Sequence, residues 1–129
     1  MDYLADTVAI IRHFSKSGKI GSTAQEIFNK ADLRENIIWI SIISIAEIMY
    51  LAERHRIELK LEELHEMLDN LGNYKILDLN MDVVLVANTI SDLELHDRLI
   101  VASAKYLDIP ILTSDKKIKA SGFVPVKWN

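Results

Sequence analysis

Four acidic side chains stand at junctions between predicted strands and helices, and they are the residues best placed to do chemistry together. Asp6 follows the first predicted strand, and Glu47 lies one turn into the helix after the second. Asp97 lies in the first turn of a later helix, and Asp115 follows the strand after that helix. In an open α/β sheet, ligands bind just beyond the carboxyl ends of the strands. We therefore expect these four acids to meet at that edge.

Each acid also has a purely structural explanation. Asp6 and Asp115 are suited to capping the helical segments that follow them. Ser44 and Glu47 match the capping-box pattern S-x-x-E. Asp97 in a first helical turn is favoured by the helix macrodipole. Taken singly, none of the four requires a catalytic role.

Several carboxylates gathered in one place favour a bound cation. Carboxylates within a few ångströms repel one another and do not all stay ionised without a compensating positive charge. A set of oxygen ligands in a chain with no cysteine suits a hard divalent ion, Mg²⁺ or Mn²⁺. One or two such ions can activate water and stabilise charge on a phosphoryl group. Together, the four acids therefore indicate metal-assisted phosphoryl chemistry.

The elements that position these acids alternate between strand and helix. Leu95–Leu107 has helical apolar spacing, and Pro110 stops that helix before a short buried strand leads to Asp115. Ile37–Ile42 is apolar on both faces, as a strand inside a parallel sheet should be. Such alternation is typical of βαβ units. It predicts one domain over residues 1–129, a three-layer α/β/α sandwich with a mainly parallel sheet of four or five strands.

The remaining elements fit this pattern. Ser22 and Gln25 match a capping box at the start of a second helix, and Gly72 follows the apolar helix stripe of Leu61–Leu71. In the helix after Ile37–Ile42, Met49 is expected to face inward. Further strands are predicted at Tyr3–Ala5, at Lys75–Leu79 and at Val124–Trp128, the last two at sheet edges, with helices near residues 7–14 and 83–90.

Composition excludes several classes of protein. No apolar run reaches the roughly 18 residues that cross a membrane, and the start of the chain lacks the pattern of a signal peptide. We therefore expect a cytoplasmic protein with no membrane role. The net charge of −4 argues against binding nucleic acid by bulk positive charge. From residue 105 on, however, five lysines outweigh two aspartates, a local balance of +3.

Four sequence motifs resemble those of the PIN-domain nucleases, most closely the VapC-type toxin ribonucleases of prokaryotic toxin–antitoxin pairs. They are Y-L-A-D-T near the start, S-I-A-E, H-D-R-L-I-V-A-S-A and I-L-T-S-D. The resemblance covers nearly the whole chain, including the order and spacing of the four acids.

This resemblance implies a metal-dependent endoribonuclease that hydrolyses single-stranded RNA with one or two Mg²⁺ or Mn²⁺ ions. Asp6, Glu47, Asp97 and Asp115 would surround the metal as catalytic ligands. It also implies a homodimer and a cognate antitoxin, part of which lies in a hydrophobic groove. Supporting hydroxyls would come from Thr7 and Thr113. The chain departs from the family at Val8, where Asn or Ser is usual.

Several cations are candidate RNA contacts. Lys116, Lys117 and Lys119 follow Asp115 directly, although such a charge run is often only solvated surface. Arg54 belongs to a second basic group that neighbouring acids dilute. His96, beside Asp97, could contact phosphate or be a surface neighbour.

Two other functions remain open from the sequence. One is a PIN scaffold that binds RNA or a protein partner without cutting, which Val8 favours. The other is a phosphoacceptor receiver domain, which also gathers acids at strand ends. A receiver domain would have paired acids near the first strand and another acid ending the middle strand. Ile40-Ser41-Ile42 provides no such acid.

Overall fold

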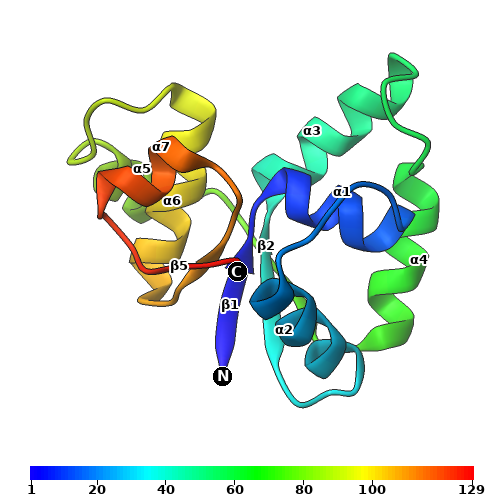
Figure 1. Ribbon diagram of the computed structural model, residues 1–129. Helices are drawn as coiled ribbons and strands as arrows, with labels where there is room; N and C mark the ends of the chain where they lie inside the picture. The colour runs from blue at the N-terminus through cyan, green and yellow to red at the C-terminus, as the bar shows by residue number, and fades with distance from the viewer.

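A five-stranded sheet, parallel throughout, separates two groups of helices in the computed structural model, which describes residues 1–129 (Figure 1). The sheet order is β3-β2-β1-β4-β5. The fold class predicted from the sequence is confirmed, with five strands. Their bounds are β1 (Asp2–Ala5), β2 (Ile37–Ser41), β3 (Tyr74–Leu77), β4 (Ile111–Leu112) and β5 (Val126–Lys127).

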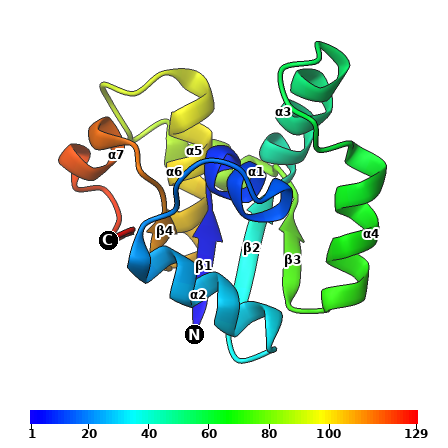
Figure 2. The same cartoon turned by 45° about the vertical axis from the view of Figure 1, so that its right-hand side comes forward.

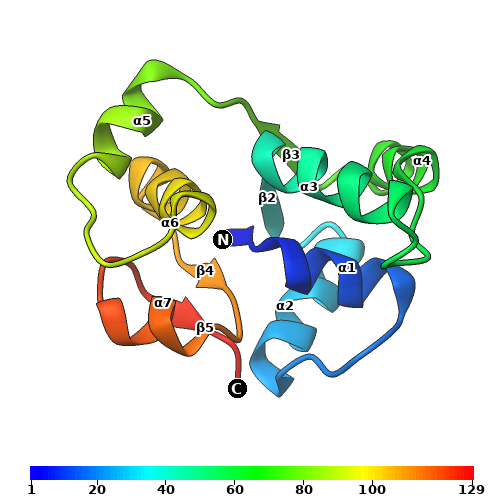
Figure 3. The ribbon, with the colours of Figure 1, turned by 90° about the horizontal axis from the view of Figure 1, so that it is seen from above.

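Helices cover both faces of this sheet, and Figure 3 shows α5, α6 and α7 on one side with α1 to α4 on the other. None of the seven helices combines the length and the apolar character that crossing a bilayer requires. Their bounds are α1 (Thr7–Ser15), α2 (Ser22–Asp32), α3 (Ile42–Glu53), α4 (Leu61–Leu71), α5 (Met81–Ala87), α6 (Leu95–Leu107) and α7 (Lys116–Ser121).

Alternating side chains on the strands build a separate apolar core on each face. In β1, Tyr3 and Ala5 pack with helices α1 to α4, whereas Leu4 packs with α5 to α7. In β4, Leu112 belongs to the core under α1 to α4, and Ile111 belongs to the core under α5 to α7. Because both faces are buried, the inner strands need apolar residues at every position, which explains why they read as continuous hydrophobic runs.

The central strand β1 is the point at which the order of the sheet reverses. It pairs with β2 on one side and with β4 on the other, and both pairings are parallel (Figure 2). After β3 the chain crosses back through α5 and α6 to lay down β4 on the opposite side of β1. Such a switch point leaves a crevice beyond the carboxyl ends of the strands. Asp6 directly follows β1 at this crevice.

Several predicted boundaries are confirmed. Helix α6 runs over Leu95–Leu107, and α4 ends before Gly72, whose φ of +82° is the left-handed value that glycine adopts without strain. Both predicted edge strands are present as β3 and β5.

The capping box predicted at Ser22 and Gln25 is wrong. The N-cap of α2 is Gly21, and no side chain caps it. The carbonyl oxygen of Trp128 instead accepts a hydrogen bond from the backbone N–H of Ala24 at 3.0 Å. A Cβ atom at Gly21 would collide with that same carbonyl oxygen, so only glycine fits. The residues just after β5 therefore complete the start of α2.

The second predicted capping box, Ser44 with Glu47, is also wrong. Helix α3 begins at Ile42, three residues before the start that a Ser44 cap would give, and Ser41 caps it by accepting a hydrogen bond from the N–H of Ile43 at 3.1 Å. Ser44 is buried inside the helix. Met49, expected to face inward, is 43% exposed. The earlier start of α3 removes the capping explanation for Glu47.

Candidate active site

A polar cleft of about 280 Å³ lies at the carboxyl edge of the sheet, and all four acids line it. They come from four separate places in the chain, so only the tertiary fold brings them together. The prediction that the four acids meet at this edge therefore agrees with the geometry. The walls are Asp6, Thr7, Val8, Arg12, Glu47, His96, Asp97, Ile100, Ser114 and Asp115.

Both carboxylate oxygens of Asp6, which lines this cleft, accept hydrogen bonds. One carboxylate oxygen, Oδ1, accepts a hydrogen bond from the backbone N–H of Ala9 at 2.8 Å, which makes Asp6 the N-cap of α1. The other, Oδ2, accepts a hydrogen bond from the hydroxyl of Thr113. Burial raises the pKa of Asp6, the two hydrogen bonds oppose that shift, and the charges of Asp115 and Asp97 add to it. The capping role is real, but Asp6 also feels two other acids.

Thr113 links the first acid to the fourth. This buried hydroxyl donates to Asp6 and accepts from the backbone N–H of Asp115 at 3.0 Å. Asp115 in turn caps α7 by accepting hydrogen bonds from the N–H groups of Lys117 and Ile118 at 2.8 and 3.1 Å. The Thr113 hydroxyl predicted beside the fourth acid therefore ties the ends of β1 and β4 together.

Asp97 faces the cleft from the first turn of α6. Its pKa is raised, first by partial burial and then by the charge of Asp115, with smaller contributions from Glu94 and Glu47, while His96 opposes the shift. The N-cap of α6 is Glu94, so Asp97 does not serve as the cap. A raised pKa caused by other carboxylates is typical of a site that gathers negative charge.

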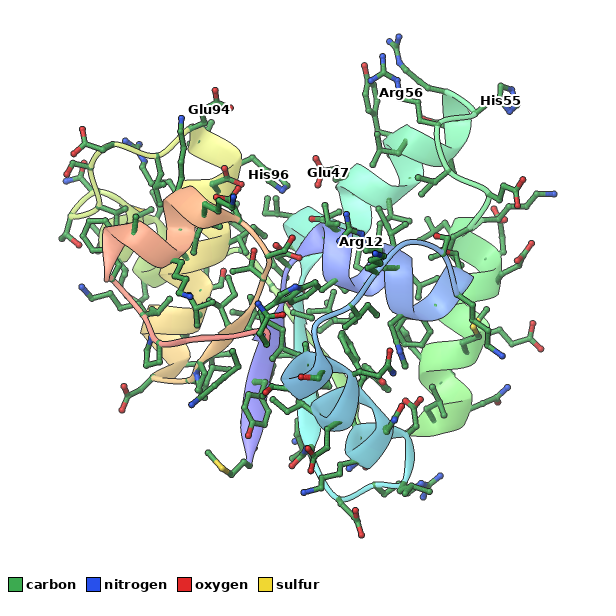
Figure 4. The ribbon with its side chains drawn as sticks, viewed as in Figure 1. Arg12, Glu47, His55, Arg56, Glu94 and His96 are labelled. Atoms are coloured by element: carbon green, nitrogen blue, oxygen red, sulfur yellow. The ribbon has the colours of Figure 1, made fainter.

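Glu47 reaches the cleft from α3 and is paired with His96 of α6. The two side chains point toward each other (Figure 4), with Glu47 Oε1 3.0 Å from His96 Nε2. His96 Nε2 also lies 3.4 Å from the hydroxyl of Thr7, which donates to the hydroxyl of Ser44 at 2.9 Å. The predicted supporting hydroxyl of Thr7 thus joins the start of α1 to α3 and to His96.

The donor set fits a hard cation in its chemistry. Four carboxylates and nearby hydroxyls supply only oxygen, the ligand type that Mg²⁺ and Mn²⁺ prefer. In their present positions, however, no three acidic or histidine side chains stand close enough together to form a metal site. Glu47 is engaged by His96, and Asp6 and Asp115 by their hydrogen bonds. Carboxylates must therefore approach one another for an ion to be shared.

The predicted RNA contacts fall in different places. Lys116 and Lys119 line a second hollow, which adjoins the cleft, whereas Lys117 lies outside both. Arg54 ends α3, with its guanidinium carbon 4.6 Å from the ring centre of Tyr50. It is not a wall of the cleft, and Figure 4 shows the adjacent His55 at the far end of α3 from Glu47.

Some site residues were missed or underrated by sequence reasoning. Arg12 lines the cleft four residues after Val8, a spacing that puts both on one face of α1 and would have predicted it. The sequence leaves open whether His96 contacts phosphate or only lies at the surface, and it does not predict a contact with Glu47. That contact depends on how α3 packs against α6, for which the sequence carries no signal. Val8, the departure from the family, is a wall of the cleft and 44% exposed.

The chain belongs to the PIN domain family, whose pattern matches residues 3–124. Members of this family are typically nucleases, and PIN nucleases generally use divalent metal ions. No curated protein sequence matches the chain.

Several solved structures of toxin–antitoxin complexes share this fold. The VapBC2 complex from Rickettsia felis, bound to promoter DNA, is 20% identical with a TM-score of 0.73, and the match covers 100% of both chains. FitAcB from Neisseria gonorrhoeae is 20% identical with a TM-score of 0.71, over 96% of this chain and 95% of that one. A toxin–antitoxin complex from Klebsiella pneumoniae is 22% identical with a TM-score of 0.66, over 97% and 95%. At such identities the likeness establishes the fold.

Proposed function

We propose that this protein is a metal-dependent endoribonuclease that hydrolyses single-stranded RNA, and that it is the toxin of a toxin–antitoxin pair. The observation that carries the proposal is the cleft lined by four acids from four separate elements. Three of these acids lie close enough to act on one another electrostatically, since the pKa of Asp6 is raised first by burial and then by the charges of Asp115 and Asp97. Membership of the PIN family and the likeness to toxin structures support the same conclusion.

In this proposal Asp6, Glu47, Asp97 and Asp115 hold one or two Mg²⁺ or Mn²⁺ ions. A bound ion supplies an activated water and neutralises charge on the phosphoryl group. Thr113 orients Asp6 through its hydrogen bond. No covalent intermediate with the protein is needed, because in this proposal the nucleophile is a water that the ion activates.

We also propose an antitoxin as partner, and an apolar groove supports this assignment. The groove lies between α3, α4 and β3, has a volume of about 460 Å³, and is lined mainly by aliphatic side chains. An amphipathic segment of the antitoxin would place its apolar side there. The apolar walls include Ile42, Ile45, Leu61, Leu64, Leu68 and Ile76.

A second candidate is a PIN scaffold that binds RNA or protein without cutting. Two observations favour it. Val8 places an apolar side chain in the wall of the cleft, and the acids do not stand close enough together for a formed metal site. Either feature would reduce catalysis while leaving a binding surface intact.

Cleavage of a single-stranded RNA separates these two functions. We expect cleavage with Mn²⁺, none with chelator, and a loss of at least about 100-fold in Asp97→Asn, as when a preorganised charge is removed from an active site. Asp82→Asn is the matched control, because Asp82 also lies in a first helical turn, that of α5, but is not a wall of the cleft. Absence of cleavage by the parent protein under every metal condition would leave the binding scaffold as the function.

A further inference from the structure

The acidic cleft is the middle one of three contiguous polar hollows. On one side it shares Ser114 and Asp115 with a hollow of about 380 Å³ formed around α7 and the end of the chain. On the other side it shares Arg12 with a hollow of about 420 Å³ between α1 and α2. The three hollows therefore adjoin one another through shared wall residues, in a path that runs from α7 across the acidic cleft to the space between α1 and α2.

The hollow beside α7, which we call the α7 hollow, is cationic. Its walls carry three lysines, Lys116, Lys119 and Lys127, and one acidic side chain, Asp115. The carboxylate of Asp115 already accepts hydrogen bonds from two backbone N–H groups of α7. Trp128 forms part of the wall and is held in place where its carbonyl meets the start of α2. The positive charge of this hollow therefore faces solvent without an acidic partner of its own.

The hollow between α1 and α2, which we call the α1–α2 hollow, has a similar character. Arg12 and Lys16 supply cations, and amide side chains supply further polar groups. Its one acid, Asp32, is engaged by His13 Nε2 at 3.1 Å and by the hydroxyl of Tyr74. The charge of Asp32 is thus largely satisfied within the protein. Arg12 Nη1 donates to the carbonyl oxygen of Lys19 at 2.9 Å, but neither Arg12 nor Lys16 forms an ion pair, so both keep a positive charge that can attract an anion.

The order of charges along this path is positive, negative, positive, in a chain whose net charge is −4. A protein with excess acid that places its cations on both sides of an acidic centre is suited to a polyanion that crosses the centre. We propose that single-stranded nucleic acid lies along all three hollows, with phosphates on each side of the reacting one bound in the α7 hollow and in the α1–α2 hollow. This inference rests on the proposed nuclease function and adds the course of its substrate.

Matched pairs of lysine variants test this path. The probe is a fluorescent single-stranded oligonucleotide, and binding is measured across a salt series in chelator, which withholds the metal ion that cleavage requires in the proposed function. Lys116→Ala, Lys119→Ala and Lys127→Ala are compared with Lys117→Ala, which removes the same charge from α7 but lies outside the hollow. We expect the slope of log affinity against log salt to fall by about 0.7 for each phosphate that the variant no longer neutralises.

The α1–α2 hollow has its own matched pair. Lys16→Asn suits the left-handed backbone at that position, where φ is +54°, and Lys19→Asn removes the same charge just outside the hollow. Extending the probe by one nucleotide at a time at each end distinguishes the two hollows. Extension of the probe at one end should raise the affinity of the parent but not that of the Lys16 variant. Extension at the other end should raise the affinity of the parent but not that of the Lys116, Lys119 and Lys127 variants.

The outcomes separate this inference from the proposed function. Equal reductions in affinity in the hollow variants and in Lys117→Ala and Lys19→Asn would overturn the path and leave only bulk charge. A parent protein that binds no single strand would overturn it as well. Binding with the expected variant pattern but no Mn²⁺-dependent cleavage would support the path and refute the nuclease. Cleavage by the parent, together with hollow variants that bind like their controls, would support the nuclease and refute the path.

Discussion

Asp97 is the residue at which a structural role and a functional role make opposite predictions. As an acid near a helix N-terminus it should stabilise α6. As a member of a cluster it should destabilise the metal-free protein, because partial burial and then the charges of Asp115, Glu94 and Glu47 raise its pKa. The capping explanations were correct for Asp6 and Asp115, which cap their helices while also lining the cleft. Capping a helix is therefore compatible with lining the acidic cleft.

The pH dependence of stability distinguishes these roles for Asp97. Its pKa in the folded protein lies above the unperturbed value of 3.8, so the folded state holds its proton more tightly than the unfolded chain. The stabilisation from that proton is complete below pH 3.8 and is lost as the pH rises through the raised pKa. Asn carries no such proton. The free energy of unfolding of Asp97→Asn, relative to the parent, should therefore increase with pH above 3.8.

Urea unfolding in chelator between pH 4 and pH 8 measures this difference. The expected gain at neutral pH is below about 1 kcal/mol, because partly exposed charges are screened by solvent. Asp82→Asn, which loses the same macrodipole benefit in α5, should show no gain. A relative stability of Asp97→Asn that stays flat or falls with pH would mean that the neighbouring carboxylates do not act on it.

At the scale of elements, local patterns located the strands and helices but not the contacts between them. Leu95–Leu107 was predicted with its observed bounds because apolar spacing and Pro110 are both local signals. The start of α2 was mispredicted because its partner, the carbonyl of Trp128, lies about a hundred residues away in the chain. For the same reason the pairing of Glu47 with His96 had no signal. The sequence thus predicts which acids line one cleft, but not which hydrogen bonds and ion pairs each acid forms there.

Substitutions at the start of α2 test this correction. Ser22→Ala should change the free energy of unfolding by less than about 0.5 kcal/mol, because Ser22 is exposed and caps nothing. Gly21→Ala should cost about 1–3 kcal/mol, because its new Cβ meets the backbone of Trp128 and must displace the segment after β5. Thermal or urea unfolding measures both. A larger cost at Ser22 than at Gly21 would restore the capping box.

For the whole molecule, the two apolar cores leave a further apolar surface on α3. Met49 and Tyr50 are 43% and 49% exposed, and Ile42 at the start of the same helix is 37% exposed. Neither apolar core includes these three side chains. We predict that this protein is a homodimer, since exposed apolar surface of this kind marks protein contacts.

Light scattering coupled to gel filtration measures the mass at micromolar concentration. We expect about twice the 14.7 kDa of one chain, and a shift toward the monomer in Met49→Asp, which places a charge on the exposed face of α3. Leu33→Asp is the matched control, because Leu33 is 73% exposed at the end of α2, away from α3. A monomeric parent protein at that concentration contradicts the dimer.

The central claim is that the four acids share a divalent ion, and a melting curve with and without Mn²⁺ tests it most directly. A ligand that binds only the folded state stabilises it by mass action, so at a hundredfold excess over Kd the Tm of the parent should rise by about 10 °C. Asp97→Asn should melt slightly higher than the parent in chelator and gain much less from Mn²⁺, while Asp82→Asn should gain as much as the parent. If Asp97→Asn instead melts lower than the parent in chelator and gains equally from Mn²⁺, the four acids do not form a metal site.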